Sequence, residues 1–155
     1  MWHAMGVSYG RHMTTQTPTT TLDPETVDRL SAGFHRCFSD FDADDGLFAE
    51  DTFFDLLPPF WRFQLQGIDD FRSWLSGYAP DGHHVRVVRT WPTPSGFVTE
   101  QESLGHLDGR EVTGRKVIVC EVRDGRIAEL IVYCDGDWDQ ELRARHAAEA
   151  PMIRP

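Results

Sequence analysis

The sequence predicts an α+β fold in which a curved antiparallel sheet forms a cone and helices cover its concave face. Two segments with helical spacing of apolar residues come first, and four long alternating segments follow. Asp-Gly pairs, which favour tight hairpin turns, separate the last three alternating segments. Helices segregated from an antiparallel sheet define the α+β class, and a long curved sheet needs its concave face covered.

Length and charge narrow the possible functions. The chain has 155 residues, 40% of them hydrophobic, which is enough for one globular domain. We expect this domain over 22–155, and a disordered tail over the Thr-rich, non-periodic segment 1–21. A formal net charge of −10 repels phosphate backbones and anionic lipids, so neither nucleic acid nor a membrane is an expected partner.

The first helix is expected over 24–41. Asp23 is a good N-cap and Pro24 suits the first helical position. The apolar residues of helical period are Val27, Leu30, Phe34, Phe38 and Phe41. The acidic residues that follow end the helix.

Between the first helix and the sheet, the sequence indicates several short elements. We expect a helical turn over 47–51, a strand over 52–57 that Pro58-Pro59 breaks, and an extended return over 60–66. A second helix follows Gly67, and its apolar stripe is Ile68, Phe71, Leu75 and Tyr78.

The remaining strands are expected at 84–91, 96–107, 111–123 and 126–135. The Asp-Gly pairs at 108–109 and 124–125 are hairpin turns. A short final helix is expected after Asp137, which can cap it, with Gln140 at the capping-box position.

Cysteine and lysine usage suggest the cellular setting. The chain has three cysteines, Cys37, Cys120 and Cys134. Because this number is odd and no CxxC pair occurs, we expect reduced, buried thiols and a cytoplasmic location.

Lys116 is the only lysine among many arginines. We interpret this bias as the composition of a GC-rich bacterial genome and attach no mechanism to it.

Several short motifs resemble the SnoaL-like branch of the nuclear-transport-factor-2-like (NTF2-like) superfamily. They are FAEDT at 48–52, GIDDF at 67–71, Thr99-Glu100, and EVRDGRIAE at 121–129 running on to YCD at 133–135. The resemblance extends over 22–155 and implies a cone-shaped, cystatin-like α+β barrel around one apolar pocket.

The resemblance does not imply one activity, because the superfamily includes polyketide cyclases, ketosteroid isomerases, limonene-epoxide-hydrolase-like enzymes, dehydratases and non-enzymes. The epoxide hydrolase pattern has a Tyr and an Asn where this chain has Phe54 and Leu56. Where that pattern has an Arg and an Asp, this chain has Gln101 and Ser103. Where the pattern has its second Asp, this chain has Val132, and the cyclases of the superfamily have their acid/base Asp at the same position. None of the residues present can exchange a proton near neutral pH, so neither chemistry is expected.

The resemblance implies that this pocket binds a small, largely apolar ligand. The ligand-binding candidates are Phe54, Leu56, Trp61, Gln101, Ser103 and Val132. Alternatively, Gln101 and Ser103 bond each other, neighbouring strands or water. We expect no cofactor and no metal, and an affinity nearly constant between about pH 6 and 8 because no titrating group contacts the ligand.

The catalytic candidates are weak. They are Asp55, His84 and Glu121. Alternation places Asp55 on the outside if Phe54 faces the pocket. His83 and His84 point to opposite sides of a strand, so they do not form a metal-binding pair.

Two groups of acidic residues are interpreted as structural rather than catalytic or metal-binding. Glu100 and Glu102 share a strand face that the resemblance places outside, where an arginine such as Arg115 can pair with them. The acidic run at 40–46 resembles a calcium loop with Asp51 in twelfth place, but its glycine falls one position late. A solvated helix end is the preferred interpretation.

Three hypotheses for function stay open. The first is a pocket protein without catalysis. The second is a cyclase, isomerase or dehydratase with a non-standard residue set. The third is an interaction module with a filled cavity. In each case we expect a homodimer through the outer sheet face, where Ile131, Tyr133 and Trp138 lie.

Overall fold

The computed structural model describes residues 22–150 and 152, except for 42, 44–45 and 79–80. The predicted tail over 1–21 and part of the acidic run lie outside these residues. The elements in chain order are α1 (Pro24–Asp40), β1 (Phe48–Leu57), β2 (Phe63–Gln66), α2 (Ile68–Tyr78), β3 (Asp81–Pro92), β4 (Gly96–Leu107), β5 (Arg110–Arg123), β6 (Arg126–Cys134) and α3 (Gln140–Glu149).

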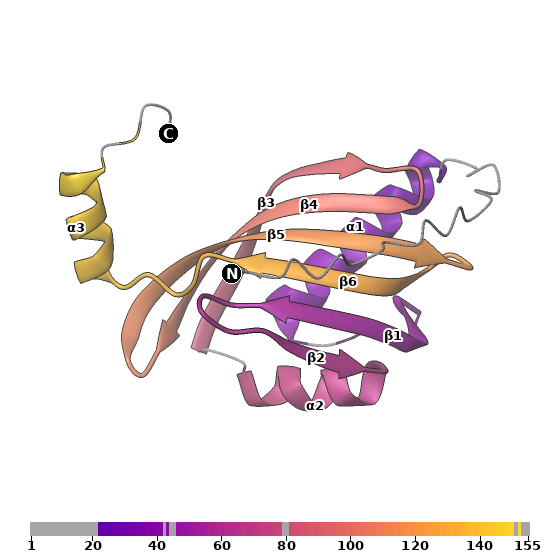
Figure 1. Ribbon diagram of the computed structural model, residues 1–155, viewed down its shortest axis with the longest axis horizontal. Coiled ribbons are helices and arrows are strands. Elements are labelled where there is room, and N and C mark those ends of the chain that lie inside the picture. The colour runs from indigo at the N-terminus through magenta and orange to yellow at the C-terminus, as the bar shows by residue number, and fades with distance from the viewer. Residues whose placement is uncertain (1–21, 42, 44–45, 79–80, 151, 153–155) are drawn as a thin grey trace, which may run out of the picture.

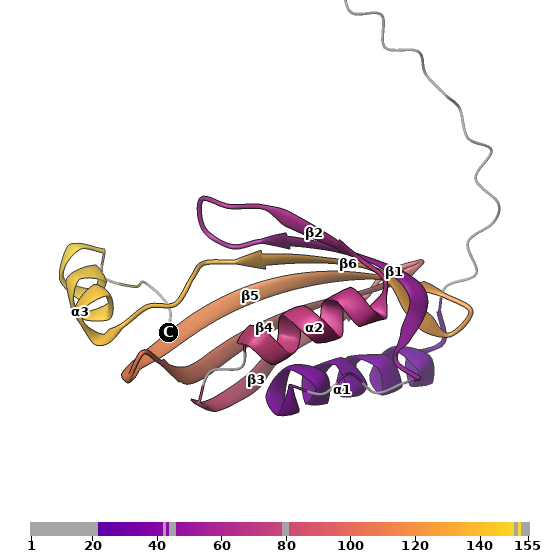
Figure 2. The same ribbon diagram turned by 90° about the horizontal axis from the view of Figure 1, so that it is seen from below.

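The strands form one curved sheet in the order β2-β1-β6-β5-β4-β3 (Figure 1). Neighbouring strands are antiparallel except β1 and β6, which are parallel, so the sheet is mixed rather than wholly antiparallel. Figure 2 shows α1 and α2 side by side under the concave face, whereas α3 lies beyond one end of the sheet. The predicted α+β class, with helices covering the concave face, is confirmed. No helix in the described part of the chain is long and apolar enough to cross a membrane.

The helix α1 packs on the sheet through its apolar stripe. Asp23 caps it by accepting a hydrogen bond from the Thr26 amide at 2.9 Å, as the sequence predicts. The His35 Nε2 atom lies 2.8 Å from the carbonyl oxygen of Val85 and ties the helix to β3. The buried stripe residues are Val27, Leu30, Phe34, Cys37 and Phe38.

The helix α2 closes the core under β1 and β2. Phe71 is fully buried, and its ring stacks on that of Phe54 with centroids 4.2 Å apart and planes 4° apart. Phe48 meets the same ring edge-on, with centroids 5.4 Å apart. These rings form part of the hydrophobic core between α2 and β1.

Both Asp-Gly turns are confirmed as two-residue hairpin loops. Asp108 and Gly109 have φ values of 52° and 75°, and Asp124 and Gly125 have 53° and 73°. Two successive residues of positive φ define the type I′ turn, whose twist matches the flanking strands. The strands around these loops therefore begin and end within a residue of the predicted limits.

Two local predictions are wrong. The segment 47–51 is not a helical turn, because Phe48 pairs with Ile127 of β6 and the chain then bulges before Phe53. The final helix is capped by Asp139 and not by Asp137, since Trp138 still pairs with Thr113 and keeps the chain extended. In both places a pairing between distant residues overrides the local signal.

Candidate ligand-binding site

Strand alternation and register bring most of the predicted ligand-binding residues to the concave face. Leu56 of β1 is the partner of Val132 in β6, and Gln101 of β4 is the partner of Lys116 in β5. Ser103 lies two residues beyond Gln101 on the same face. The predicted residues buried here are Phe54, Leu56, Gln101, Ser103 and Val132.

A cavity of about 180 Å³ lies on this face, lined by residues of the sheet and of both α1 and α2. Its lining residues are Phe38, Leu56, Leu57, Pro58, Phe63, Trp74, Lys116, Val132 and Cys134. Most of them are apolar or aromatic, as in sites that bind small organic molecules. The volume is below the usual range of about 300–1,000 Å³ for such sites, so any occupant is small.

Only Leu56 and Val132 of the six predicted residues line the cavity, and the other four, Phe54, Trp61, Gln101 and Ser103, lie outside the lining. Phe54 is stacked on Phe71 and forms part of the core below the cavity. Trp61 is 72% exposed, because it lies at the tip of the β1–β2 hairpin beyond Pro58-Pro59. Phe60 in the same tip has a φ of 62°, and its side chain is fully exposed.

A larger hollow of about 1,140 Å³ lies between α3 and the β4–β5 turn. Charged side chains such as Arg110, Glu111 and Glu141 line it, and α3 has no buried residue. This hollow is an open groove beside a helix that lies apart from the core. We therefore place the candidate site in the smaller, mainly apolar cavity on the concave face.

Lys116 is a residue of this cavity that the sequence analysis did not predict. Its side chain lines the cavity, although the residue is only 8% exposed. The Nζ atom donates a hydrogen bond to Ser103 Oγ at 3.2 Å, and Ser103 in turn donates to the carbonyl oxygen of Gly114 at 3.4 Å. Within the described residues, Lys116 forms no ion pair.

The cross-strand partner of Lys116 has a hydrogen-bond donor without an acceptor among the described residues. Gln101 is 2% exposed, and its Nε2 donor has no hydrogen-bond partner in the described part of the chain. The alternative that these side chains bond neighbouring strands holds for Ser103, which donates to Gly114 of β5, but not for the Nε2 donor of Gln101. A buried, unpaired donor costs free energy, so its presence needs an explanation.

His83 lies near this cluster, where α1 ends. Its ring centroid is 4.7 Å from that of Phe41, and neither ring nitrogen makes a well-formed hydrogen bond with the described residues. Burial, and then the positive charge of Lys116, lower the pKa of His83 to about 4, against a smaller opposing effect of the Phe38 carbonyl. The ring is therefore neutral at pH 7.

The weak catalytic candidates lie away from the cavity lining. Asp55 forms a two-point ion pair with Arg62, at 2.8 Å and 2.5 Å, on the opposite face of β1 from Leu56. Hydrogen bonding to Arg62 lowers the pKa of Asp55 and keeps the carboxylate ionised. His84 is exposed, and Glu121 is half-buried next to the β3–β4 turn.

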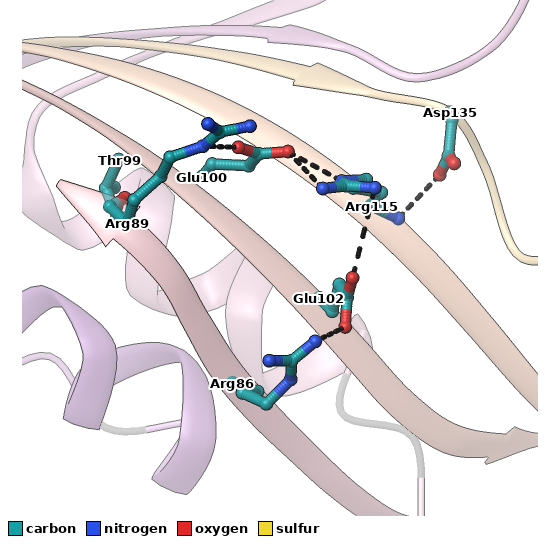
Figure 3. A network of polar contacts seen from close by, with 7 residues as sticks. All are labelled: Arg86, Arg89, Thr99, Glu100, Glu102, Arg115 and Asp135. Atoms are coloured by element: carbon teal, nitrogen blue, oxygen red, sulfur yellow. Dashed lines mark hydrogen bonds and ion pairs between the residues drawn. The ribbon is translucent and has the colours of Figure 1, made fainter. Parts of the chain in front are cut away.

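On the outer face, acidic and basic side chains form a continuous network (Figure 3). Glu100 accepts hydrogen bonds from Arg89 at 2.5 Å and from Arg115 at 2.6 Å. Glu102 pairs with Arg86 and contacts Arg115 at 4.0 Å. The predicted pairing of both glutamates with arginines is confirmed, and the hydrogen bond to Arg89 is the main reason that the pKa of Glu100 is lowered.

Comparison with known proteins supports the fold assignment. Neither a protein-family model nor a curated protein matches the chain. Among solved structures, an LEH-like epoxide hydrolase of M. tuberculosis is 23% identical with a TM-score of 0.58, and the match covers 77% of this chain and 83% of that one. An NTF-2 like protein of unknown function from Burkholderia xenovorans LB400 is 18% identical with a TM-score of 0.55, covering 84% and 97%.

A third similar structure is TsrD from Streptomyces laurentii, which is 14% identical with a TM-score of 0.60, covering 84% of this chain and 99% of that one. Since these identities are low, the comparisons define the class of fold. The chain has the NTF2-like α+β fold, as its sequence motifs predict.

Proposed function

We propose that this chain is a small-molecule pocket protein, and that a small, largely apolar ligand occupies the cavity of about 180 Å³ on the concave face. The observation that carries the proposal is the lining itself. Leu56, Phe63, Trp74 and Val132 provide a largely apolar wall that a ligand can desolvate, although the core around it is otherwise closely packed. The open volume also argues against an interaction module with a filled cavity.

The residue types in the cavity support binding rather than epoxide hydrolysis. The positions that would activate water or protonate the departing oxygen hold Gln101, Ser103 and Val132. None of them exchanges a proton near neutral pH. We expect no diol from limonene oxide above the rate in buffer, even though one similar structure is an epoxide hydrolase.

One observation favours the enzyme alternative, a cyclase, isomerase or dehydratase with a different residue set. His83 is neutral and lies on the concave side, where it could accept a proton from a ligand. However, a pKa of about 4 makes it a weak base at neutral pH, and it does not line the cavity. Binding without proton transfer is therefore the better-supported function.

A ligand screen tests the proposal. Small cyclic and short-chain compounds are added to the full chain, and binding is followed by native mass spectrometry and by the melting temperature. We expect hits that raise the melting temperature and that lose affinity when Val132→Phe fills the cavity. The control is Leu107→Phe, an exposed position at the β4–β5 turn outside the cavity lining and the outer-face interface, where the added ring should leave binding unchanged. Hits that bind both variants equally would contradict a site in this cavity.

We also propose a homodimer through the outer sheet face. Tyr133 is 51% exposed, and it lies beside Val117, its partner in β5, which is also exposed. Exposed apolar residues that cluster on a sheet often mark an interface. Tyr133→Glu should shift the protein toward monomer, and light scattering that finds the unmodified protein monomeric at micromolar concentration would contradict the dimer.

A cytoplasmic location is part of the proposal. Cys120 and Cys134 are thiols outside any disulfide among the described residues, and burial raises the pKa of Cys120 well above its ordinary value. Such thiols suit a reducing compartment. Fractionation of the native host would test this location.

A further inference from the structure

The cavity contains a buried cation without a carboxylate partner. Lys116 is 8% exposed, and the only polar contact of its Nζ atom among the described residues is the Ser103 hydroxyl. A buried ammonium group is costly unless a negative charge or several acceptors compensate for it. A lysine held in this position therefore provides a site for an anion.

The groups around Lys116 do not provide that anion. The cavity lining has no Asp or Glu in the part of the chain that the structure describes. Two acidic residues of the neighbouring strand β4, Glu100 and Glu102, lie on the outer face and pair with arginines. Asp135 accepts a hydrogen bond from the backbone amide of Arg115 at 2.6 Å.

A second donor lies beside the cation. Gln101 is the cross-strand partner of Lys116, and its Nε2 donor is buried without a partner in the described residues. The Ser103 hydroxyl donates its hydrogen to Gly114, so its oxygen faces the ammonium group as an acceptor. Gln101 is not in the cavity lining, so Lys116 is the first donor that an anion in the cavity meets, and the amide N–H is a second donor on the next strand.

We infer that the occupant of this cavity is a small apolar carboxylate. Its anionic head pairs with Lys116, with the unpartnered Gln101 amide on the neighbouring strand as a second donor behind the lining, and its hydrocarbon body lies among Leu56, Phe63 and Trp74. A volume of about 180 Å³ equals that of about six water molecules at about 30 Å³ each, so a single ring or a short chain fits. This inference rests on the proposed function, because it assigns a head group to the ligand of the same cavity.

The test compares acids with neutral compounds of the same shape. Benzoate and hexanoate are titrated into the full chain beside benzyl alcohol and hexanol, with binding measured by calorimetry. We expect the acids to bind about tenfold to a hundredfold more tightly than the alcohols, as for a desolvated charge pair. Lys116→Met should remove this preference, whereas Arg126→Met, which removes an exposed cation elsewhere, should leave it unchanged.

A second measurement needs no variant and remains informative if Lys116→Met fails to fold. Because Lys116 is the only lysine in the sequence, labelling with carbon-13 lysine gives a single set of side-chain NMR signals. We expect the acids to move the signal next to the Nζ atom and the alcohols to leave it nearly in place.

The outcomes distinguish the two proposals. Acids and alcohols that bind equally well, with no effect on the lysine signal, would overturn the carboxylate inference and leave the pocket proposal in place. Failure of every compound to bind at millimolar concentration would overturn both.

Discussion

Replacing His83 with glutamine should weaken the dependence of folding stability on pH between about 4 and 6.5. In the unfolded chain this histidine has its ordinary pKa of 6.5, whereas in the folded protein burial and the charge of Lys116 lower the pKa to about 4. Between these values the unfolded chain binds a proton that the folded protein does not bind. Stability is therefore lost as the pH falls through this window, and it is fully present above about pH 6.5.

The magnitude follows from the two pKa values. At about 1.4 kcal/mol per pH unit, the difference between 6.5 and about 4 gives an upper limit of about 3.5 kcal/mol. The ring is only partly buried, so solvent screening reduces the expected loss to about 1–2 kcal/mol. His83→Gln abolishes this titration, because an amide does not gain a proton in this range.

The assay is urea denaturation at pH 7 and at pH 4.5, followed by tryptophan fluorescence. Many carboxylates also titrate in acid, so the informative quantity is the difference between variants. His84→Gln is the matched control, since this neighbouring histidine is exposed and lies on the opposite face of β3. An equal pH dependence in the wild type and His83→Gln, or a weaker one in His84→Gln alone, would refute the placement of His83.

Three further predictions test packing and electrostatics. Phe71→Ala should destabilise the protein by about 3–5 kcal/mol because the ring is fully buried, whereas Phe60→Ala at the exposed hairpin tip should change the melting temperature little. Gly96→Ala would place a Cβ 1.7 Å from a backbone oxygen of β5 and should prevent normal folding. Gly77→Ala, which meets no atom within 4 Å, should be neutral or stabilising by up to about 1 kcal/mol, as judged by chemical denaturation. Glu100→Gln should lower the melting temperature at pH 7, and the difference should shrink as the pH falls, because the lowered pKa of Glu100 means that its ionised form stabilises the fold.

The elements that the sequence predicts well are those with strong local signals. The capped helix that begins at Pro24 and the two Asp-Gly turns are determined by residues close to one another in the chain. The segment 47–51 could not be predicted in this way. Its conformation depends on pairing between Phe48 and Ile127, which are far apart in sequence, and on Thr52, whose hydroxyl bonds the Ile127 carbonyl at 2.8 Å.

The candidate site was predicted less completely than the fold. The motif resemblance indicated which strand positions face inward, because register is shared among proteins of one fold. It did not indicate Lys116, which shares the inward face of β5 with Ile118 and Cys120 because these residues are two positions apart. That alternation is visible in the sequence, but lysine is seldom buried, and a charged residue in a strand is ordinarily assigned to solvent. Trp61 shows the opposite error. It was predicted to bind the ligand because it is aromatic, but it lies exposed at the tip of a hairpin.

The basic residues on the two faces of β5 differ in whether they have an acidic partner, and this difference supports a functional reason for Lys116. On the outer face, Arg115 is matched by Glu100 and Glu102. On the inner face, the next residue is a lysine that no carboxylate matches among the described residues. The chain has 25 acidic residues against 15 lysines and arginines, so acidic side chains are abundant. In a protein with this excess of negative charge, an unmatched buried cation inside an apolar cavity is most simply explained by an anion that arrives from outside the chain.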